Sequence, residues 1–200
     1  MSAVDYRRAL HRIPELDNQL PETVQLVQRI LAPLPCRVFS PITGSVCAWF
    51  DAGKSDAVAF RAELDALPVT EATDLPYASV HPGRMHACGH DTHTAMLLGA
   101  GKVLWAHKDE LAGTVRLMFQ TAEEQSRGAE VMIENGGVEG ADAVFGTHIG
   151  TILDKTIQSS MWMKMSSGKV PLYLLLLWRN FLHLRKLHPG KTKKNAWKQA

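Results

Sequence analysis

The chain has 200 residues, of which 46% are hydrophobic and 21% are charged. This composition is ordinary for a soluble globular protein that can bury a sizeable core. The formal net charge of +2 hides an asymmetry. Residues 1–154 hold 12 Lys and Arg against 20 Asp and Glu, whereas residues 155–200 hold 10 Lys and Arg and no acid. The break predicts two parts of different character, residues 1–150 and a basic tail at 151–200.

The three cysteines, Cys36, Cys47 and Cys88, are an odd number without paired spacing, which argues against a disulfide framework. The first residues lack the apolar core of a signal peptide, so we expect a cytoplasmic protein. The longest apolar run, 170–178, contains a proline and is shorter than the roughly 20 residues that cross a bilayer. We therefore expect no membrane-spanning segment.

The apolar periodicity predicts an alternation of helices and strands. In chain order these are a helix over 4–13, a helix from 21 that ends before Pro33, strands at 38–39, 46–50 and 57–60, a helix over 94–105, a strand over 114–120, a helix over 128–134 and a strand over 143–146. Such alternation is typical of a layered α/β fold with a largely parallel sheet.

The segment 85–93 concentrates groups that bind metals, since it holds one thiol and three of the nine histidines of the chain. Cys88 and His90 are expected in the loop before the helix 94–105, which Asp91 or Thr92 would cap. Thiolate and imidazole are ligands of zinc and its neighbours. The alternative without a metal is a capping histidine, a packed thiol and a surface histidine. A structural metal site is disfavoured, because no second cysteine-rich pair is present to close it.

Further polar side chains follow the predicted strands, at the edge where ligands bind in open α/β sheets. Glu63 and Asp65 follow the strand at 57–60, and the alternative for them is a solvated loop. Convergence of the strand ends would assemble a metal site from residues far apart in the sequence. Its ligands would be Cys88, His90, Glu124 and His148, with Glu123 beside them.

Glu123 and Glu124 are adjacent after the strand at 114–120, so their side chains point in different directions. One can bind a metal while the other holds a water molecule, whose pKa a metal lowers from about 16 to about 7. A carboxylate within hydrogen-bonding reach can take the proton of that water and later donate it to a leaving amine. On its own, a pair of adjacent glutamates is a common surface feature. It indicates a catalytic site here only because the Cys88 and His90 cluster is also present.

Several segments together resemble the M20 metallopeptidases, and more narrowly their amidohydrolase branch, which includes hippurate hydrolases and N-acyl-amino-acid amidohydrolases. They are Arg61-Ala-Glu-Leu-Asp-Ala-Leu-Pro68, Met85-His-Ala-Cys-Gly-His-Asp-Thr-His-Thr94, Phe119-Gln-Thr-Ala-Glu-Glu124 and Gly146-Thr-His148, with the opening Leu10-His-Arg-Ile-Pro-Glu-Leu16. The resemblance covers roughly residues 5–150. It implies a three-layer zinc-peptidase-like catalytic domain with a mixed, largely parallel sheet.

The resemblance also implies a site with two divalent ions, of zinc, manganese, cobalt or nickel, that cleaves the amide bond of N-acyl amino acids such as hippurate or N-acetyl amino acids. By motif position, the metal ligands are Cys88, His90, Glu124 and His148. Glu123 matches the general base, and Asp65 matches an acid that orients a ligand. Two departures are mild, since Glu63 stands where many members have Asp and Thr121 where Pro is common. The family also implies a possible homo-oligomer.

From about residue 151 the family pattern is lost. The resemblance implies an inserted lid or dimerisation domain and one further histidine ligand, and neither has a counterpart, so we expect an incomplete catalytic domain. A frameshift or a truncated gene product explains the tail most simply, and substitution of the missing ligand by His183 or His188 is disfavoured. The alternative function is an inactive family remnant that binds only a metal or a partner. For the basic tail we expect neither a nucleic acid nor a membrane partner, because it lacks interleaved aromatic residues and a clean amphipathic pattern.

Overall fold

The computed structural model describes residues 1–53, 56–150, 156–165 and 172–178, with backbone alone from residue 150 onward. Its elements follow in chain order. They are α1 (Ala3–His11), α2 (Pro21–Leu31), β1 (Arg37–Phe39), β2 (Val46–Phe50), β3 (Ala57–Glu63), α3 (His90–Ala106), a short 3-10 helix (Lys108–Glu110), β4 (Thr114–Gln120), α4 (Gly128–Glu134), β5 (Ala143–Gly150), β6 (Thr156–Met165) and β7 (Leu172–Trp178). The predicted alternation of helices and strands is confirmed.

The strands form one mixed sheet in the order β1-β2-β4-β3-β5-β6-β7. β3 pairs in parallel with β4 on one side and with β5 on the other, and the remaining pairs are antiparallel. The sheet is therefore parallel only at its centre, where the helices α3 and α4 supply the crossover connections that parallel strands need. The expectation of a largely parallel sheet holds for this centre and is wrong for the flanking strands.

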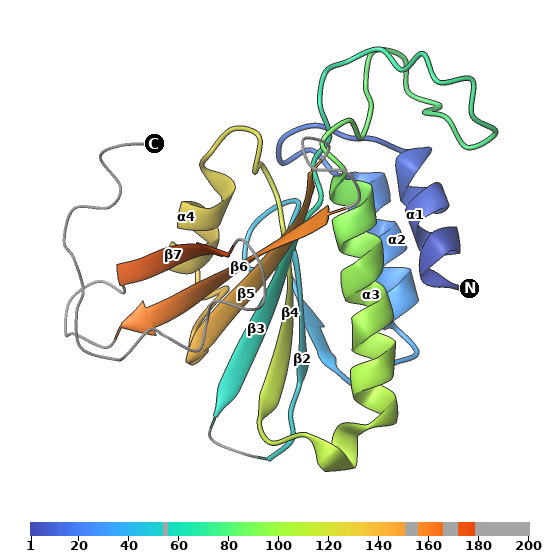
Figure 1. Cartoon of the computed structure of the whole chain (residues 1–200). Helices are drawn as coiled ribbons and strands as arrows, with labels where there is room; N and C mark the ends of the chain where they lie inside the picture. The colour runs from blue at the N-terminus through green and yellow to red at the C-terminus, as the bar shows by residue number, and fades with distance from the viewer. Residues whose placement is uncertain (54–55, 151–155, 166–171, 179–200) are drawn as a thin grey trace.

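The helices cover both faces of the sheet, which gives the predicted three layers (Figure 1). α1, α2 and α3 pack on one face, where Leu10, Leu31, Leu98 and Phe119 belong to the main buried cluster. α4 packs on the other face, where Met132 belongs to a smaller buried cluster. The burial of these apolar side chains is the main favourable contribution to the folded state.

The start of α3 differs from the prediction. The helix begins at His90, four residues before the predicted start, and Gly89 is its N-cap with a left-handed φ of 92° and no capping side chain. Glycine adopts this backbone conformation without a steric penalty, so the chain turns sharply into the helix. His90 is therefore the first helical residue rather than part of the preceding loop, and neither Asp91 nor Thr92 caps the helix.

The end of β5 also differs. The predicted strand stops at residue 146, but β5 continues to Gly150 because β6 pairs along its whole length, with His148 opposite Gln158. His148 therefore lies within a strand rather than after one. The sheet continues past residue 150 through β6 and β7, and the division into residues 1–150 and a separate tail stays a prediction.

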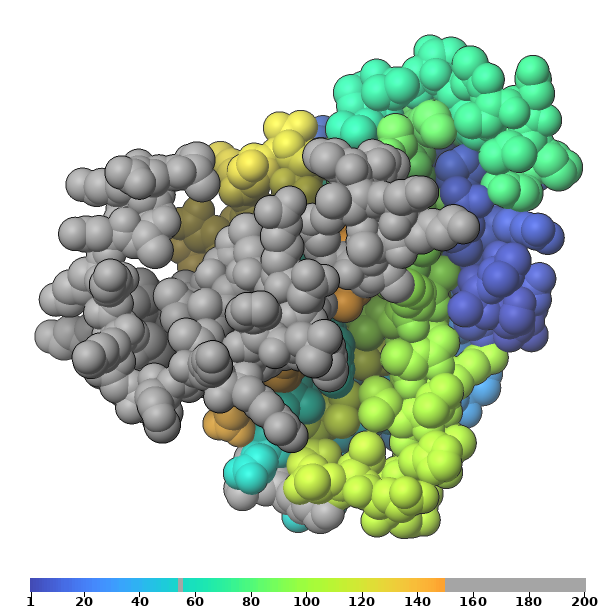
Figure 2. All heavy atoms as spheres, in the orientation of Figure 1, coloured from blue at the N-terminus to red at the C-terminus, as the bar shows by residue number. Residues whose placement is uncertain are grey.

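The polar loop between β3 and α3 lies against the N-terminal segment, where Figure 2 shows the teal and green residues beside the blue ones. Arg12 donates a hydrogen bond to the carbonyl of Pro76 at 3.1 Å, and a ring nitrogen of His81 lies 3.0 Å from the carbonyl of Pro14. These contacts fix the connection that leads into the predicted metal-binding segment. Within the described residues, no helix combines the length and apolar character needed to cross a membrane.

Candidate metal centre

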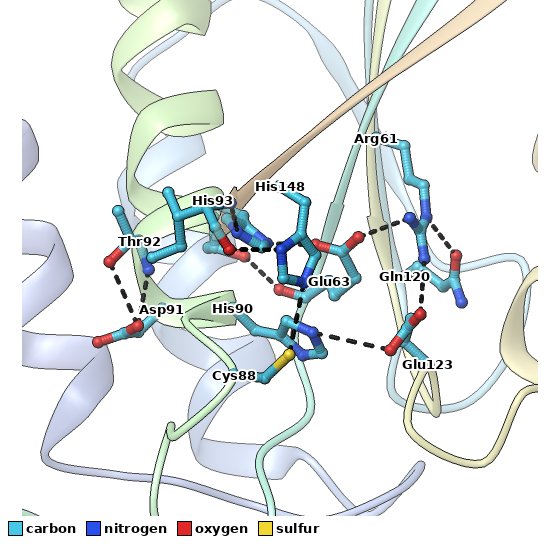
Figure 3. A network of polar contacts seen from close by, with 12 residues as sticks. Arg61, Glu63, Cys88, His90, Asp91, Thr92, His93, Gln120, Glu123 and His148 are labelled. Carbon is cyan, nitrogen blue, oxygen red and sulfur yellow. Dashed lines mark hydrogen bonds and ion pairs between the residues drawn. The ribbon is translucent and has the colours of Figure 1, made fainter. Parts of the chain in front are cut away.

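The predicted site residues converge where β3, β4 and β5 end and α3 begins. Figure 3 shows Cys88, His90, Glu123 and His148 turned toward one another. Parallel strands bring their carboxyl ends to the same edge of a sheet, and this is the edge where ligands bind in open α/β folds. The structure thus gathers residues from four separate segments of the sequence.

His90 is the central donor of the cluster. Its side chain is buried, and its Nδ1 lies 2.8 Å from the backbone carbonyl of Asp65. Because a carbonyl only accepts, Nδ1 carries the proton and Nε2 keeps a free lone pair. Nε2 is buried and has no hydrogen-bond partner among the described residues. An orphaned lone pair on an imidazole held at its other nitrogen is the arrangement found in metal-binding histidines.

Cys88 and His148 lie on one side of His90. The Sγ of Cys88 is 3.4 Å from the Nε2 of His148, and the Nδ1 of His148 donates a hydrogen bond of 2.6 Å to the carbonyl of Ile149. The ligand atoms of Cys88, His90 and His148 all lie within 4.8 Å of one another. Burial raises the pKa of the Cys88 thiol to about 12, and the neighbouring carboxylate of Glu124 adds to the rise. A cation at this point would offset both effects and favour the thiolate.

Glu123 and Glu124 lie on the other side of His90. The nearest carboxylate oxygens are 3.7 Å (Glu123 Oε2) and 3.8 Å (Glu124 Oε1) from the Nε2 of His90. The Oε1 of Glu124 is buried and has no hydrogen-bond partner among the described residues. His90 therefore links a group of ligand atoms that holds sulfur and nitrogen, with Cys88 and His148, to a group that holds carboxylate oxygen, with Glu123 and Glu124.

The loop that carries the two glutamates is tightly folded. Ala122 and Ser126 have positive φ angles of 49° and 56°, and the amide of Gly128 donates to the carbonyl of Ala122 at 3.1 Å. A Cβ on Gly128 would overlap the carbonyl oxygen of Thr121, so only glycine fits there. The loop thus turns back into α4 directly after the glutamates.

Asp65 contacts residues on both sides of the cluster, namely His90 and Glu124. Its carboxylate accepts a hydrogen bond of 3.0 Å from the backbone amide of Glu124, and its backbone carbonyl holds the ring of His90. Burial raises the pKa of Asp65, and the amides of Glu124 and Glu123 oppose this rise. Asp65 therefore fixes one histidine and the acidic loop at once.

Arg61 and Gln120 lie beside Glu123, and the sequence analysis assigned them no role in the site. The guanidinium of Arg61 contacts Glu63 at 2.5 Å, Gln120 at 2.6 Å and the Oε1 of Glu123 at 3.8 Å. The Oε2 of Glu123 is thereby left facing His90. The available signal was the alternation of Arg61 and Glu63 along β3, which puts both on one face of the strand.

Glu63 is buried, yet it is held as an anion. Burial alone would raise its pKa, but the hydrogen bond from His93 and the charge of Arg61 outweigh burial and lower the pKa to about 2. The Nδ1 of His93 lies 2.7 Å from Glu63 Oε2. Glu63 is therefore committed to protein partners.

The residues fit a divalent metal. The sulfur and nitrogen atoms of Cys88, His90 and His148 lie within 4.8 Å of one another, and so do the nitrogen and oxygen atoms of His90, Glu123 and Glu124. Two of these buried atoms, the Nε2 of His90 and the Oε1 of Glu124, have no hydrogen-bond partner among the described residues. These donor types suit zinc, manganese, cobalt and nickel. All six predicted residues, namely Asp65, Cys88, His90, Glu123, Glu124 and His148, lie at this one place. His183 and His188 fall outside the described residues.

A cavity of about 290 Å³ adjoins the site on the α4 side of the sheet. Arg61 and Glu123 lie at its polar part. Its apolar lining consists of Met118, Ala129, Met132, Ile133, Val138 and Val144. The volume is at the lower end of the range of small-molecule pockets.

The chain is similar to known proteins over about three quarters of its length. The chain is 43% identical over 168 residues to N-acetyl-L-cysteine deacetylase of Bacillus subtilis, and the match covers 76% of this chain and 39% of the relative. It is 44% identical over 152 residues to IAA-amino acid hydrolase ILR1-like 5 of Arabidopsis thaliana, covering 75% of this chain and 35% of the relative. The chain thus spans less than half the length of these relatives.

A solved structure supports the fold. The Bacillus subtilis YXEP protein, described as a dinuclear metal binding peptidase from the M20 family, superposes with a TM-score of 0.71 at 40% identity, over 74% of this chain and 42% of that protein. Residues 59–163 match the model of peptidase family M20/M25/M40. Because this match extends over more than half of the sequence, the chain belongs to the peptidase family M20/M25/M40.

Proposed function

We propose that this chain carries the active site of a metal-dependent amidohydrolase that cleaves the amide bond of N-acyl amino acids. The observation that carries the proposal is the buried Nε2 of His90, which has no hydrogen-bond partner among the described residues and lies between Cys88 and His148 on one side and the two glutamates on the other. The names of the relatives, a deacetylase of N-acetyl-L-cysteine and a hydrolase of IAA-amino acids, support the substrate class.

The proposed metal ligands are Cys88, His90, Glu124 and His148, for two divalent ions. Bound ions supply Lewis-acid polarisation of the amide carbonyl and lower the pKa of water. Asp65 keeps Nε2 of His90 free for coordination through its backbone carbonyl, and it holds the amide of Glu124 through its carboxylate.

Glu123 is the proposed general base. Its Oε2 faces the Nε2 of His90 at 3.7 Å, so it can reach a water molecule among the ligand groups, while its Oε1 is turned toward Arg61. Glu123 takes a proton from the water as the water oxygen bonds to the amide carbon. It then gives that proton to the amine nitrogen as the carbon–nitrogen bond breaks. The products are a carboxylic acid and the free amino acid.

The cavity beside Glu123 supports an apolar acyl group in the substrate. A substrate whose amide lies next to Glu123 can extend its acyl part over the mouth of the cavity and between Met118 and Met132. Burial of apolar surface there contributes about 25 cal/mol per Å². We also propose a cytoplasmic location and a small-molecule partner, with assembly into a homo-oligomer.

The test combines metal content and turnover. The chain is stripped with a chelator, reconstituted with zinc, manganese, cobalt or nickel, and assayed with N-acetyl-L-cysteine and hippurate. About two ions per chain with hydrolysis support the proposal. Glu123→Gln should lower kcat by about 10²–10⁴-fold with metal retained, whereas the matched variant Glu124→Gln should lose metal. Unchanged turnover in Glu123→Gln would exclude Glu123 as the base.

The second candidate is a chain that binds only a metal or a partner and catalyses no reaction, and the observation in its favour is that the converging ligand atoms would hold an ion whether or not hydrolysis follows. Metal binding without hydrolysis of any substrate by the reconstituted chain would favour this candidate. Turnover that depends on Glu123 would exclude it.

A further inference from the structure

His93 is buried inside the candidate metal centre, yet both of its ring nitrogens already have protein partners. Its Nδ1 lies 2.7 Å from the Oε2 of Glu63, and its Nε2 lies 2.9 Å from the backbone nitrogen of Ile149. Because the amide of Ile149 can only donate, Nε2 is the acceptor and Nδ1 carries the proton. Glu63 fixes this tautomer by accepting that proton's hydrogen bond.

The contacts of His93 converge on the strand that carries His148. Ile149 follows His148 directly in β5, and the rings of His93 and His148 are in edge contact with centroids 4.5 Å apart. The side chain of His148 is exposed, and its ring nitrogens contact the carbonyl of Ile149 and the Sγ of Cys88. The position of His148 relative to His90 therefore depends on what holds this end of β5.

We propose that Glu63 and His93 form a clamp that positions His148 for metal binding, and that His93 is not itself a ligand. The distinction matters because Glu63, His90 and His93 also have ligand atoms within 4.8 Å of one another and so form a rival group. The clamp joins β3, α3 and β5, since Thr94 Oγ1 also donates to the backbone carbonyl of Glu63 at 2.7 Å. The inference rests on the metal site of the proposed function and does not require turnover.

Two amide substitutions separate a clamp from a ligand. In His93→Gln the side-chain amide reaches the position of Nε2, where its oxygen can accept from Ile149. In His93→Asn the amide reaches only the position of Nδ1, so the bond to Glu63 is retained and the bond to Ile149 is lost. Both variants remove the imidazole, and they differ in which half of the clamp survives.

The readout is cobalt affinity of the full chain, measured by competition with a chromophoric chelator. We expect His93→Asn to bind cobalt about 10–100-fold more weakly than the parent, as is typical when a ligand's orienting partner is lost. His93→Gln should stay close to the parent. Equal losses in both variants would show that the imidazole is a ligand, and no loss in either would show that the clamp has no role. Both outcomes overturn the proposal.

The cobalt spectrum distinguishes positioning from general damage. In His93→Asn the charge-transfer absorption of the Cys88 thiolate should persist while the ligand-field bands change, because Cys88 stays in place and His148 is displaced. Loss of the charge-transfer absorption as well, with unfolding of the metal-free variant at a lower temperature than His93→Gln, would indicate a collapsed site and overturn the proposal. A parent chain that binds cobalt without hydrolysing any substrate contradicts the proposed function alone. A parent that binds no cobalt contradicts both.

Discussion

Cys88 Sγ and His148 Nε2 lie 3.4 Å apart although 60 positions separate the two residues in the chain. Neither side chain could reach the other from its own segment. The contact depends on the parallel pairing of β3 with β5, which brings the end of β5 beside the start of α3. The candidate metal centre is thus a product of the sheet order rather than of the dense local motif alone.

The first prediction concerns the thiol. Cys88→Ser replaces a soft sulfur ligand with a neutral hydroxyl, so the thiolate-to-cobalt absorption should vanish. The affinity for cobalt should fall by more than about 10–100-fold, which is the loss expected when only a partner that orients a ligand is removed. Cys36→Ser is the matched control, since Cys36 is also a half-buried free thiol but lies in another part of the fold. Equal cobalt binding by the two serine variants would remove Cys88 from the ligand set.

The second prediction concerns the glycine between two proposed ligands. A Cβ on Gly89 would lie 2.4 Å from the Cδ1 of Ile149, and its φ of 92° is strained for any other residue. Gly89→Ala should therefore lower the free energy of unfolding by more than the about 1–3 kcal/mol of backbone strain alone. It should also weaken cobalt binding, because the displaced Ile149 follows His148. Chemical unfolding and chelator competition measure the two effects.

Gly83→Ala is the control for this prediction, because Gly83 has a similar φ of 73° and nothing within 4 Å of its added Cβ. Gly83→Ala should lower the free energy of unfolding through backbone strain but leave the affinity for cobalt unchanged. A second substitution, Ile149→Ala, should restore metal binding to the Gly89→Ala variant. Identical behaviour of both glycine variants would mean that the contact with Ile149 has no consequence.

The proposed ligand residues can be identified from the sequence, but the contacts that position them cannot. Local pattern is enough to propose Cys88, His90 and Glu124 as ligands, because residue types that bind metals cluster beside the predicted strand ends. The role proposed for His93 cannot be predicted in this way, because it depends on an amide 56 positions away. Local periodicity does not determine which strands are neighbours, and it therefore also missed the pairing with β6 that places His148 inside β5. The start of α3 was missed because Gly89 acts through its backbone, whereas capping signals are read from side chains.

The third prediction concerns the cavity beside Glu123. Ala129 is an exposed residue of α4 that lines this cavity, so Ala129→Leu should partly fill it. Hydrolysis of hippurate should fall by about tenfold or more relative to hydrolysis of N-acetyl-L-cysteine, since even one methylene in an apolar pocket changes kcat/KM by about 10–200-fold. Glu130→Leu adds the same side chain at the next position, outside the cavity lining, and should leave the ratio of kcat/KM values unchanged. An unchanged ratio in Ala129→Leu would mean that the acyl group binds elsewhere.

The last prediction concerns pH and a buried histidine behind the metal centre. The ring nitrogens of His11 lie 2.7 Å from Asp91 and 3.1 Å from Glu71. The hydrogen bond to Asp91 raises the pKa of His11, against the effects of burial and of the nearby Arg7. The adjacent His86 is buried, which lowers its pKa to about 4, so it stays neutral above that pH.

A histidine whose pKa is raised by folding stabilises the folded state fully below its unfolded pKa of about 6.5, and this contribution is lost as the pH rises through the higher folded value. His11→Gln should therefore lower the free energy of unfolding by about 1–3 kcal/mol near pH 6, with the difference shrinking toward about pH 9. Urea unfolding over this range measures the effect. His107→Gln, at an exposed histidine beside Glu110, is the control. A difference between parent and His11→Gln that stays constant over the whole range would show that His11 is neutral in the folded state.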